Sequence, residues 1–116
     1  MNVYALSVAG VNVAEGIRRF SGHAEIYEKY VKRFAEDPNY RLLCEAVAGQ
    51  NVKAAFAAAH ALKGVAGNLS MDRLYNDLYP LVEELRGGSL EHAEDLLAQV
   101  ACDYQAVVSA LETACA

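Results

Sequence analysis

The chain has 116 residues, of which 54% are hydrophobic and 22% charged, and its formal net charge is −5. This length suits one domain, and the high apolar fraction excludes a disordered chain. The 21 alanines and 13 leucines beside 2 prolines favour helices over a β-sandwich, and the acidic balance argues against a nucleic-acid binder, which needs lysine and arginine to neutralise phosphates.

The cysteines and histidines give no sign of a disulfide framework or a metal site. The three cysteines (Cys44, Cys102 and Cys115) form no CxxC pair, and the three histidines lie far from one another in the sequence. No basic leader with an apolar run opens the chain, and no stretch reaches the roughly 18 uninterrupted apolar residues of a membrane helix. We therefore expect a cytoplasmic protein with no metal, no disulfide and no direct membrane insertion.

The first third of the chain predicts a short lead-in followed by two helices. Residues 1–11 show no clear period and are expected to be extended, which places the helical domain at 12–116. Asn12 and Glu15 have capping-box spacing, which predicts a short helix ending near residues 20–22. A second helix is expected from about His23, because apolar side chains recur after it at helical spacing: Ile26, Tyr27, Tyr30, Val31 and Phe34.

A break is expected at Asp37 and Pro38, because a continuous helix would bury Arg41 and Glu45. Asp37 should cap the next helix and Pro38 should occupy its first position. The apolar face of that helix consists of Leu42, Leu43 and Val47.

The second half of the chain predicts three longer helices. The first covers residues 52–68 behind Asn51 as its cap, and the second covers 70–86, where Pro80 frees the carbonyl of Asn76 and predicts a kink. Ser89 should cap the last helix, whose apolar residues alternate at steps of three and four: Leu90, Ala93, Leu97, Val100, Tyr104, Val107, Leu111 and Ala114. That stripe could form a coiled coil, but packing within its own bundle is the favoured interpretation. The fold class is therefore all-α, an antiparallel four-helix bundle with additional short N-terminal helices.

The helix expected over residues 52–69 has two different faces. Its core stripe is formed by Ala55, Ala58, Leu62, Val65 and Leu69. The opposite face carries Lys53, Phe56, Ala57, His60, Lys63, Gly64 and Gly67. His60 therefore points away from the core, and this face carries two lysines and no acid.

The presence of two glycines in this helix needs an explanation, because each costs about 1 kcal/mol relative to alanine. Two explanations are possible. Gly64 and Gly67 could let a neighbouring helix approach closely, or they could leave His60 uncovered for another protein. An exposed neutral imidazole suits a phosphoryl acceptor, because its ordinary pKa of about 6.5 leaves it unprotonated and nucleophilic at neutral pH. Lys63, three positions on, is either a solvated charge or a partner for the incoming negative charge.

The run from Ala59 to Leu69, AHALKGVAGNL, resembles the phosphorylation-site motif of histidine-containing phosphotransfer (HPt) domains. The family pattern is a histidine, one residue, leucine, lysine, glycine and two small residues. The segment Gly16–Phe20, with Tyr27 and Phe34 after it, is similar to the N-terminal helices of that family, and the helix lengths match from about residue 12 to 115.

The resemblance implies a phosphorelay intermediate in which His60 accepts a phosphoryl group from a receiver-domain phospho-aspartate and passes it to another receiver. It implies that Lys63 is the charge partner of the phosphohistidine. Docking of the partner would use Lys53, Phe56, Ala57, Gly64, Gly67 and Asn68. The partners would be response-regulator receiver domains and an upstream hybrid sensor histidine kinase, with the chain acting as a monomer. No cofactor is intrinsic to the family, because the receiver supplies Mg²⁺, and the sequence contains no P-loop or kinase glycine-rich loop for ATP.

Two residues depart from the family pattern. Ser70 stands where many members carry glycine, and serine is expected to cap the following helix. Pro80 is unusual in that helix and is expected to tilt its second half and to alter which receiver docks. Two other classes of function are weighed against the phosphocarrier: a helical interaction module that is never phosphorylated, and, last, a stand-alone enzyme, for which one histidine and one lysine offer too few catalytic groups.

Overall fold

The computed structural model describes residues 1–115, with side chains described as far as residue 113. Seven α-helices and one 3₁₀ helix form over these residues, and no strand occurs among them. The elements are α1 (Val3–Val8), α2 (Val13–Arg19), α3 (Ala24–Arg33), η1 (Phe34–Glu36), α4 (Asn39–Ala48), α5 (Val52–Asn68), α6 (Asp72–Arg86) and α7 (Ala93–Cys115). The predicted all-α class is confirmed.

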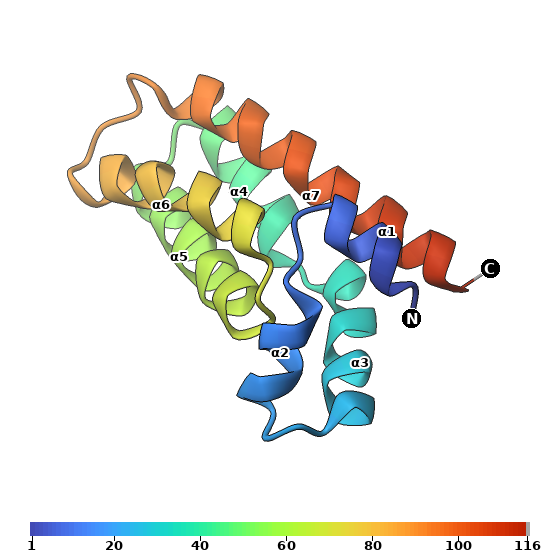
Figure 1. The fold of residues 1–116 in the computed structure, drawn as a ribbon. Helices are drawn as coiled ribbons and strands as arrows, with labels where there is room; N and C mark the ends of the chain where they lie inside the picture. The colour runs from blue at the N-terminus through green and yellow to red at the C-terminus, as the bar shows by residue number, and fades with distance from the viewer. Residues whose placement is uncertain (116) are drawn as a thin grey trace.

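Helices α4 to α7 form the bundle, in which each helix packs against the next along the chain. The longest helix, α7, runs along one side of the molecule and also contacts α4 and α1 (Figure 1). Helices α2 and α3 form a separate arm beside the loop that joins α5 to α6 (Figure 1). The apolar stripe of α7 is directed into this bundle, with Val100, Tyr104, Val107 and Leu111 buried, whereas Ala114 lies outside the residues with described side chains.

The expectation of an extended lead-in over residues 1–11 is wrong. Residues 3–8 form α1, which begins behind Asn2, whose side chain accepts a hydrogen bond from the Ala5 amide at 2.9 Å. Leu6 is fully buried, and α1 packs against α7. A helix this short covers fewer than two turns, too few for a helical repeat of apolar residues to be recognised in the sequence. The packing of Leu6 therefore explains the helix better than its local sequence does.

The predicted capping residues of the early helices, Asn12 and Asp37, both accept backbone hydrogen bonds, but the details differ from the prediction. Asn12 accepts a hydrogen bond from the Glu15 amide at 3.1 Å, but the Glu15 carboxylate does not close the capping box, because it forms an ion pair with Arg18. That guanidinium lowers the pKa of Glu15. The Asp37 side chain accepts from the Asn39 amide at 2.9 Å, so Pro38 precedes the first helical residue instead of being it.

Several residues predicted to be in the core are exposed. Tyr27, Val31 and Phe34 are buried as expected, but Ile26, Tyr30 and Leu42 are more than two-fifths exposed. On α3 the predicted apolar stripe is therefore wider than the buried surface: Tyr27 and Val31 are buried, whereas Ile26 and Tyr30 remain exposed.

The expectation that Ser70 caps α6 is also wrong. Ser70 has a φ of +55°, its hydroxyl is buried without a hydrogen-bond partner, and α6 begins after Met71 without a side-chain cap. The Met71 amide instead donates to the Ala66 carbonyl at 2.9 Å, closing the end of α5 around a left-handed residue. Glycine adopts this conformation without strain, whereas a serine here holds a positive φ that side chains disfavour.

The last two helices differ from expectation at one end. Helix α6 continues through Pro80 as far as Arg86, and a kink there stays a prediction. Helix α7 begins at Ala93 and not near Leu90, so Ser89 does not cap it. Residues 91 and 92 form a turn in which the His92 amide donates to the Glu84 carboxylate at 3.1 Å. Over the described part of the chain, no helix has both the length and the apolar character needed to cross a membrane.

Candidate functional site

Helix α5 has the bounds that the sequence predicts, because its N-terminus is capped by Asn51, whose side chain accepts from the Ala54 amide at 3.0 Å. Of the predicted core stripe, Ala55, Ala58, Leu62 and Leu69 are buried and Val65 is half-buried. Ala59 and Ala66 are fully buried as well, which the sequence reading missed. The buried face is wider than predicted because α5 packs against both α4 and α6.

His60 lies on the exposed face of α5, as predicted. Its ring stacks on Phe56, one turn earlier, with ring centres 5.6 Å apart and an angle of 22° between the planes. Within residues 1–113, no side chain forms a hydrogen bond or an ion pair with the imidazole. A ring held on one face and free at its nitrogens can act as a nucleophile, but it has no neighbouring group to relay a proton.

Lys63 follows His60 by three residues and its side chain is half-buried. Its amine lies 4.8 Å from the centre of the Tyr79 ring and 5.7 Å from that of Tyr75, both on α6. The ammonium therefore rests on aromatic faces beside the histidine.

The two glycines of α5 have different surroundings. A Cβ on Gly64 would meet nothing within 4 Å, so this position leaves open space next to His60. A Cβ on Gly67 would come within 3.2 Å of the Tyr75 ring, so this glycine permits the close approach of α6. Each of the two explanations offered by the sequence thus fits one of the glycines.

Helix α6 supplies a second side of the site that the sequence reading missed. Phe56 lies opposite Arg86, whose guanidinium carbon is 5.0 Å from the ring centre, and Lys63 lies opposite Tyr79. Because the helices are antiparallel, His60 falls between these two pairs. The sequence shows only that Tyr75, Tyr79 and Arg86 lie off the apolar stripe of α6. It does not show which residues of α5 they face, because the register of two helices depends on their packing and not on either sequence alone.

The other predicted docking residues lie along the same outer surface. Lys53, Ala57 and Asn68 are exposed. A shallow depression of about 620 Å³ opens beside Lys63 and reaches α2, with lining residues Arg19, Lys63, Gly64, Gly67, Asn68, Asp72, Tyr75 and Asn76. The structure therefore brings Lys63, both glycines and Asn68 around one hollow, whereas Lys53 lies at the opposite end of α5 from Asn68.

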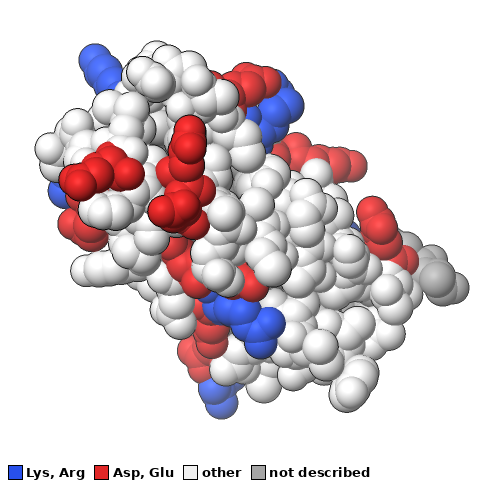
Figure 2. Space-filling view, turned by 90° about the horizontal axis from the view of Figure 1, so that it is seen from above, with Lys and Arg blue, Asp and Glu red and all other residues white. Residues whose placement is uncertain are grey.

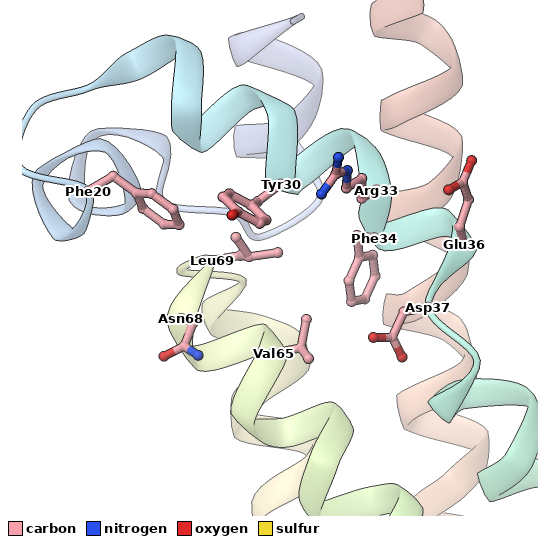
Figure 3. A pocket seen from close by; sticks show the side chains of 9 residues that line it. All are labelled: Phe20, Tyr30, Arg33, Phe34, Glu36, Asp37, Val65, Asn68 and Leu69. Carbon is pink, nitrogen blue, oxygen red and sulfur yellow. The ribbon is translucent and has the colours of Figure 1, made fainter.

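A second cavity, of about 610 Å³, lies on the other side of Asn68, between the arm and the end of α5. Figure 3 shows the ring of Phe34 and the carboxylate of Asp37 pointing toward Val65 across this space, with Phe20 and Tyr30 at its far end. Its lining is mixed in charge, since Arg33, Glu36 and Asp37 all border it.

Acidic side chains gather at the end of the molecule where α6 connects to α7, although Asp72 also lines the hollow beside Lys63. The connection between α6 and α7 and the first turn of α7 carry Glu91, Glu94 and Asp95, and acidic side chains cluster over that end in Figure 2. The outer face of α5 carries Lys53 and Lys63 and no acid, although α6 places Glu83 beside Arg86, with which it forms an ion pair at 3.6 Å. Among the described residues, no group of three or more histidine, cysteine or acidic side chains is arranged to hold a metal ion.

The comparison with protein families identifies the class. A family model described as the Hpt domain matches residues 34–114, more than half of the chain, so the chain belongs to this family, and the family indicated by the motif around His60 is confirmed. Membership implies a role in histidine phosphotransfer within two-component phosphorelays. Neither the curated proteins nor the solved structures include a match to this chain. The matched region begins at η1, so α1 to α3 lie outside it.

Proposed function

We propose that this chain is a phosphorelay intermediate that accepts a phosphoryl group on His60 from the phospho-aspartate of one receiver domain and passes it to the aspartate of another. The observation that carries the proposal is an exposed, unpaired imidazole on α5 of an Hpt domain, with open space at Gly64 in the next turn.

The transfer is a substitution at phosphorus. The lone pair of the unprotonated ring nitrogen forms the N–P bond while the P–O bond to the aspartyl carboxylate breaks, and the electron pair leaves on that carboxylate. The reverse substitution by a second aspartate returns the imidazole. Among residues 1–113, no side chain is hydrogen-bonded to the imidazole to move a proton. In this proposal the chain therefore supplies an accessible nucleophile and a favourable charge, and the receiver supplies Mg²⁺ and the other catalytic groups.

Lys63 is the charge partner in this proposal, since its ammonium lies on the α6 side of His60 and a phosphoryl group brings about two negative charges. Phe56, Ala57, Gly64 and Asn68 provide the docking surface around the histidine. Lys53 adds positive charge at its edge, and Gly67 contributes through the packing of Tyr75.

The test is incubation of the chain with a phosphorylated receiver and Mg²⁺. We expect a phosphoprotein that is labile in acid and stable in base, and no label on a His60→Gln variant. Label of equal amount on His60→Gln would overturn the assignment. The alternative function, an interaction module of the same face that is never phosphorylated, predicts that affinity for the receiver survives His60→Ala while no phosphohistidine forms in the unmodified chain.

A further inference from the structure

Lys63 is held by aromatic rings in a way that the motif does not explain. Its amine lies closer to Tyr79 than to Tyr75, at 4.8 Å and 5.7 Å from the two ring centres. Within residues 1–113, no carboxylate oxygen lies within ion-pair distance of this amine. The two rings are therefore its direct electrostatic partners in the described part of the chain.

An aromatic ring and a carboxylate hold an ammonium with different consequences. The ring attracts the cation through its quadrupole and carries no net charge, so the charge of the ammonium stays uncompensated. A carboxylate would neutralise that charge and would also repel an arriving phosphoryl group. A lysine without either partner would sample many rotamers and would have to be ordered in each transfer.

We propose that Tyr79 is a positioning residue of the phosphotransfer site, whose ring holds the Lys63 ammonium on the α6 side of His60 without neutralising it. Tyr75, which packs against Gly67, gives a second and more distant ring. Tyr79 is the informative residue because its side chain is 52% exposed and contributes little to the core. The proposal rests on the proposed function of His60, and it adds a residue outside the family motif.

The first measurement is structural and independent of phosphorylation. Protons next to an ammonium that rests on a ring are shifted upfield by the ring current. We expect this shift for the Lys63 side chain in the nuclear magnetic resonance spectrum of the full chain, a clear reduction of it in Tyr79→Leu, where only the more distant Tyr75 ring remains, and its retention in Tyr79→Phe. Tyr4→Leu is the matched control, because Tyr4 is an exposed tyrosine on α1. An unchanged Lys63 shift in Tyr79→Leu would contradict the contact.

The second measurement is the rate of phosphoryl transfer from phospho-His60 to a receiver, after labelling His60 with inorganic phosphoramidate. A cation–π contact at an exposed site corresponds to about a two- to fivefold change, so we expect Tyr79→Leu to slow transfer by about that factor. Tyr79→Phe should transfer at the original rate, and Tyr79→Glu should be slower than Tyr79→Leu because it neutralises the ammonium. In a Lys63→Ala background, Tyr79→Leu should have no further effect.

The outcomes separate this proposal from the one on which it rests. Failure of the unmodified chain to take phosphoryl from either phosphoramidate or a receiver overturns the proposed function, and the role of Tyr79 with it. Normal labelling of His60 with equal transfer rates for the unmodified chain and Tyr79→Leu overturns the positioning role alone. A slowing by Tyr79→Leu that persists undiminished in the Lys63→Ala background also overturns it, because the effect would then not act through Lys63.

Discussion

The two faces of α5 are made of similarly small side chains but meet different surroundings. On the inner face, Ala55, Ala59 and Ala66 are fully buried beside Leu62, where α4 and α6 pack against the helix. On the outer face, Ala57 and Gly64 are exposed beside His60, and a Cβ at Gly64 would meet nothing.

Small residues therefore have two different roles on this helix. On the inner face a small side chain lets two neighbouring helices approach, so its benefit is packing and stability. On the outer face a small side chain leaves the imidazole accessible, and at Gly64 this access costs helix propensity, because glycine is a poorer helix former than alanine. A substitution on the inner face should therefore lower the free energy of unfolding, and one on the outer face should change transfer while the fold persists.

The largest expected effect is on the inner face. Leu62 is fully buried, two residues after His60, and Leu62→Ala should lower the free energy of unfolding by about 3 kcal/mol through lost burial and the cavity left behind. Urea unfolding followed by circular dichroism measures this loss. Lys53→Ala, at an exposed position of the same helix, is the control and should change stability by less than about 0.5 kcal/mol. Equal losses for the two variants would contradict the division between the faces.

The outer face should respond in the opposite direction. Gly64→Ala should raise the free energy of unfolding by about 1 kcal/mol, since alanine favours the helix and its Cβ meets no neighbour. Gly67→Ala is the matched comparison and should gain less, because its Cβ would press on the Tyr75 ring. Unfolding in urea distinguishes the two variants, and an equal gain at both positions would show that Gly67 has no packing role.

A larger side chain at Gly64 tests access directly. Gly64→Leu should leave the free energy of unfolding at or above its original value while slowing phosphoryl transfer to a receiver by at least about tenfold, because it obstructs the approach to His60. Transfer at the original rate would mean that partners reach the imidazole from another side.

Features set by interactions between residues close in sequence can be predicted from this sequence, whereas features set by contacts between distant segments cannot. The bounds of α5 and the exposure of His60 were predicted correctly, because an Asn51 cap and the position of a residue around a helix are local properties. Helix α1 was missed, because six residues contain less than two turns and Leu6 is held by the distant α7. Tyr79 and Arg86 were missed as site residues for a related reason: their places beside α5 depend on the register between two helices.

The smallest expected effect lies in the connection between α6 and α7, outside both faces of α5. The His92 ring is hydrogen-bonded to the Glu84 carboxylate at 2.8 Å, and this bond, followed by the charge of Glu91, raises the pKa of His92 above its ordinary value. A raised pKa means that the folded state binds the proton more tightly than the unfolded state does. The resulting stability is fully present below the ordinary histidine pKa of about 6.5 and is lost as the pH rises through the raised value.

Comparison of the chain with a His92→Gln variant at about pH 6 and about pH 8.5 should isolate this contribution. We expect the difference in the free energy of unfolding between the two proteins, measured in urea, to shrink at the higher pH. The backbone amide of residue 92 also donates to Glu84, at 3.1 Å, and it remains in the variant, so the change reports the ring alone. A difference of the same size at both pH values would mean that the turn depends on the amide bond and on packing, with no share from the protonated imidazole.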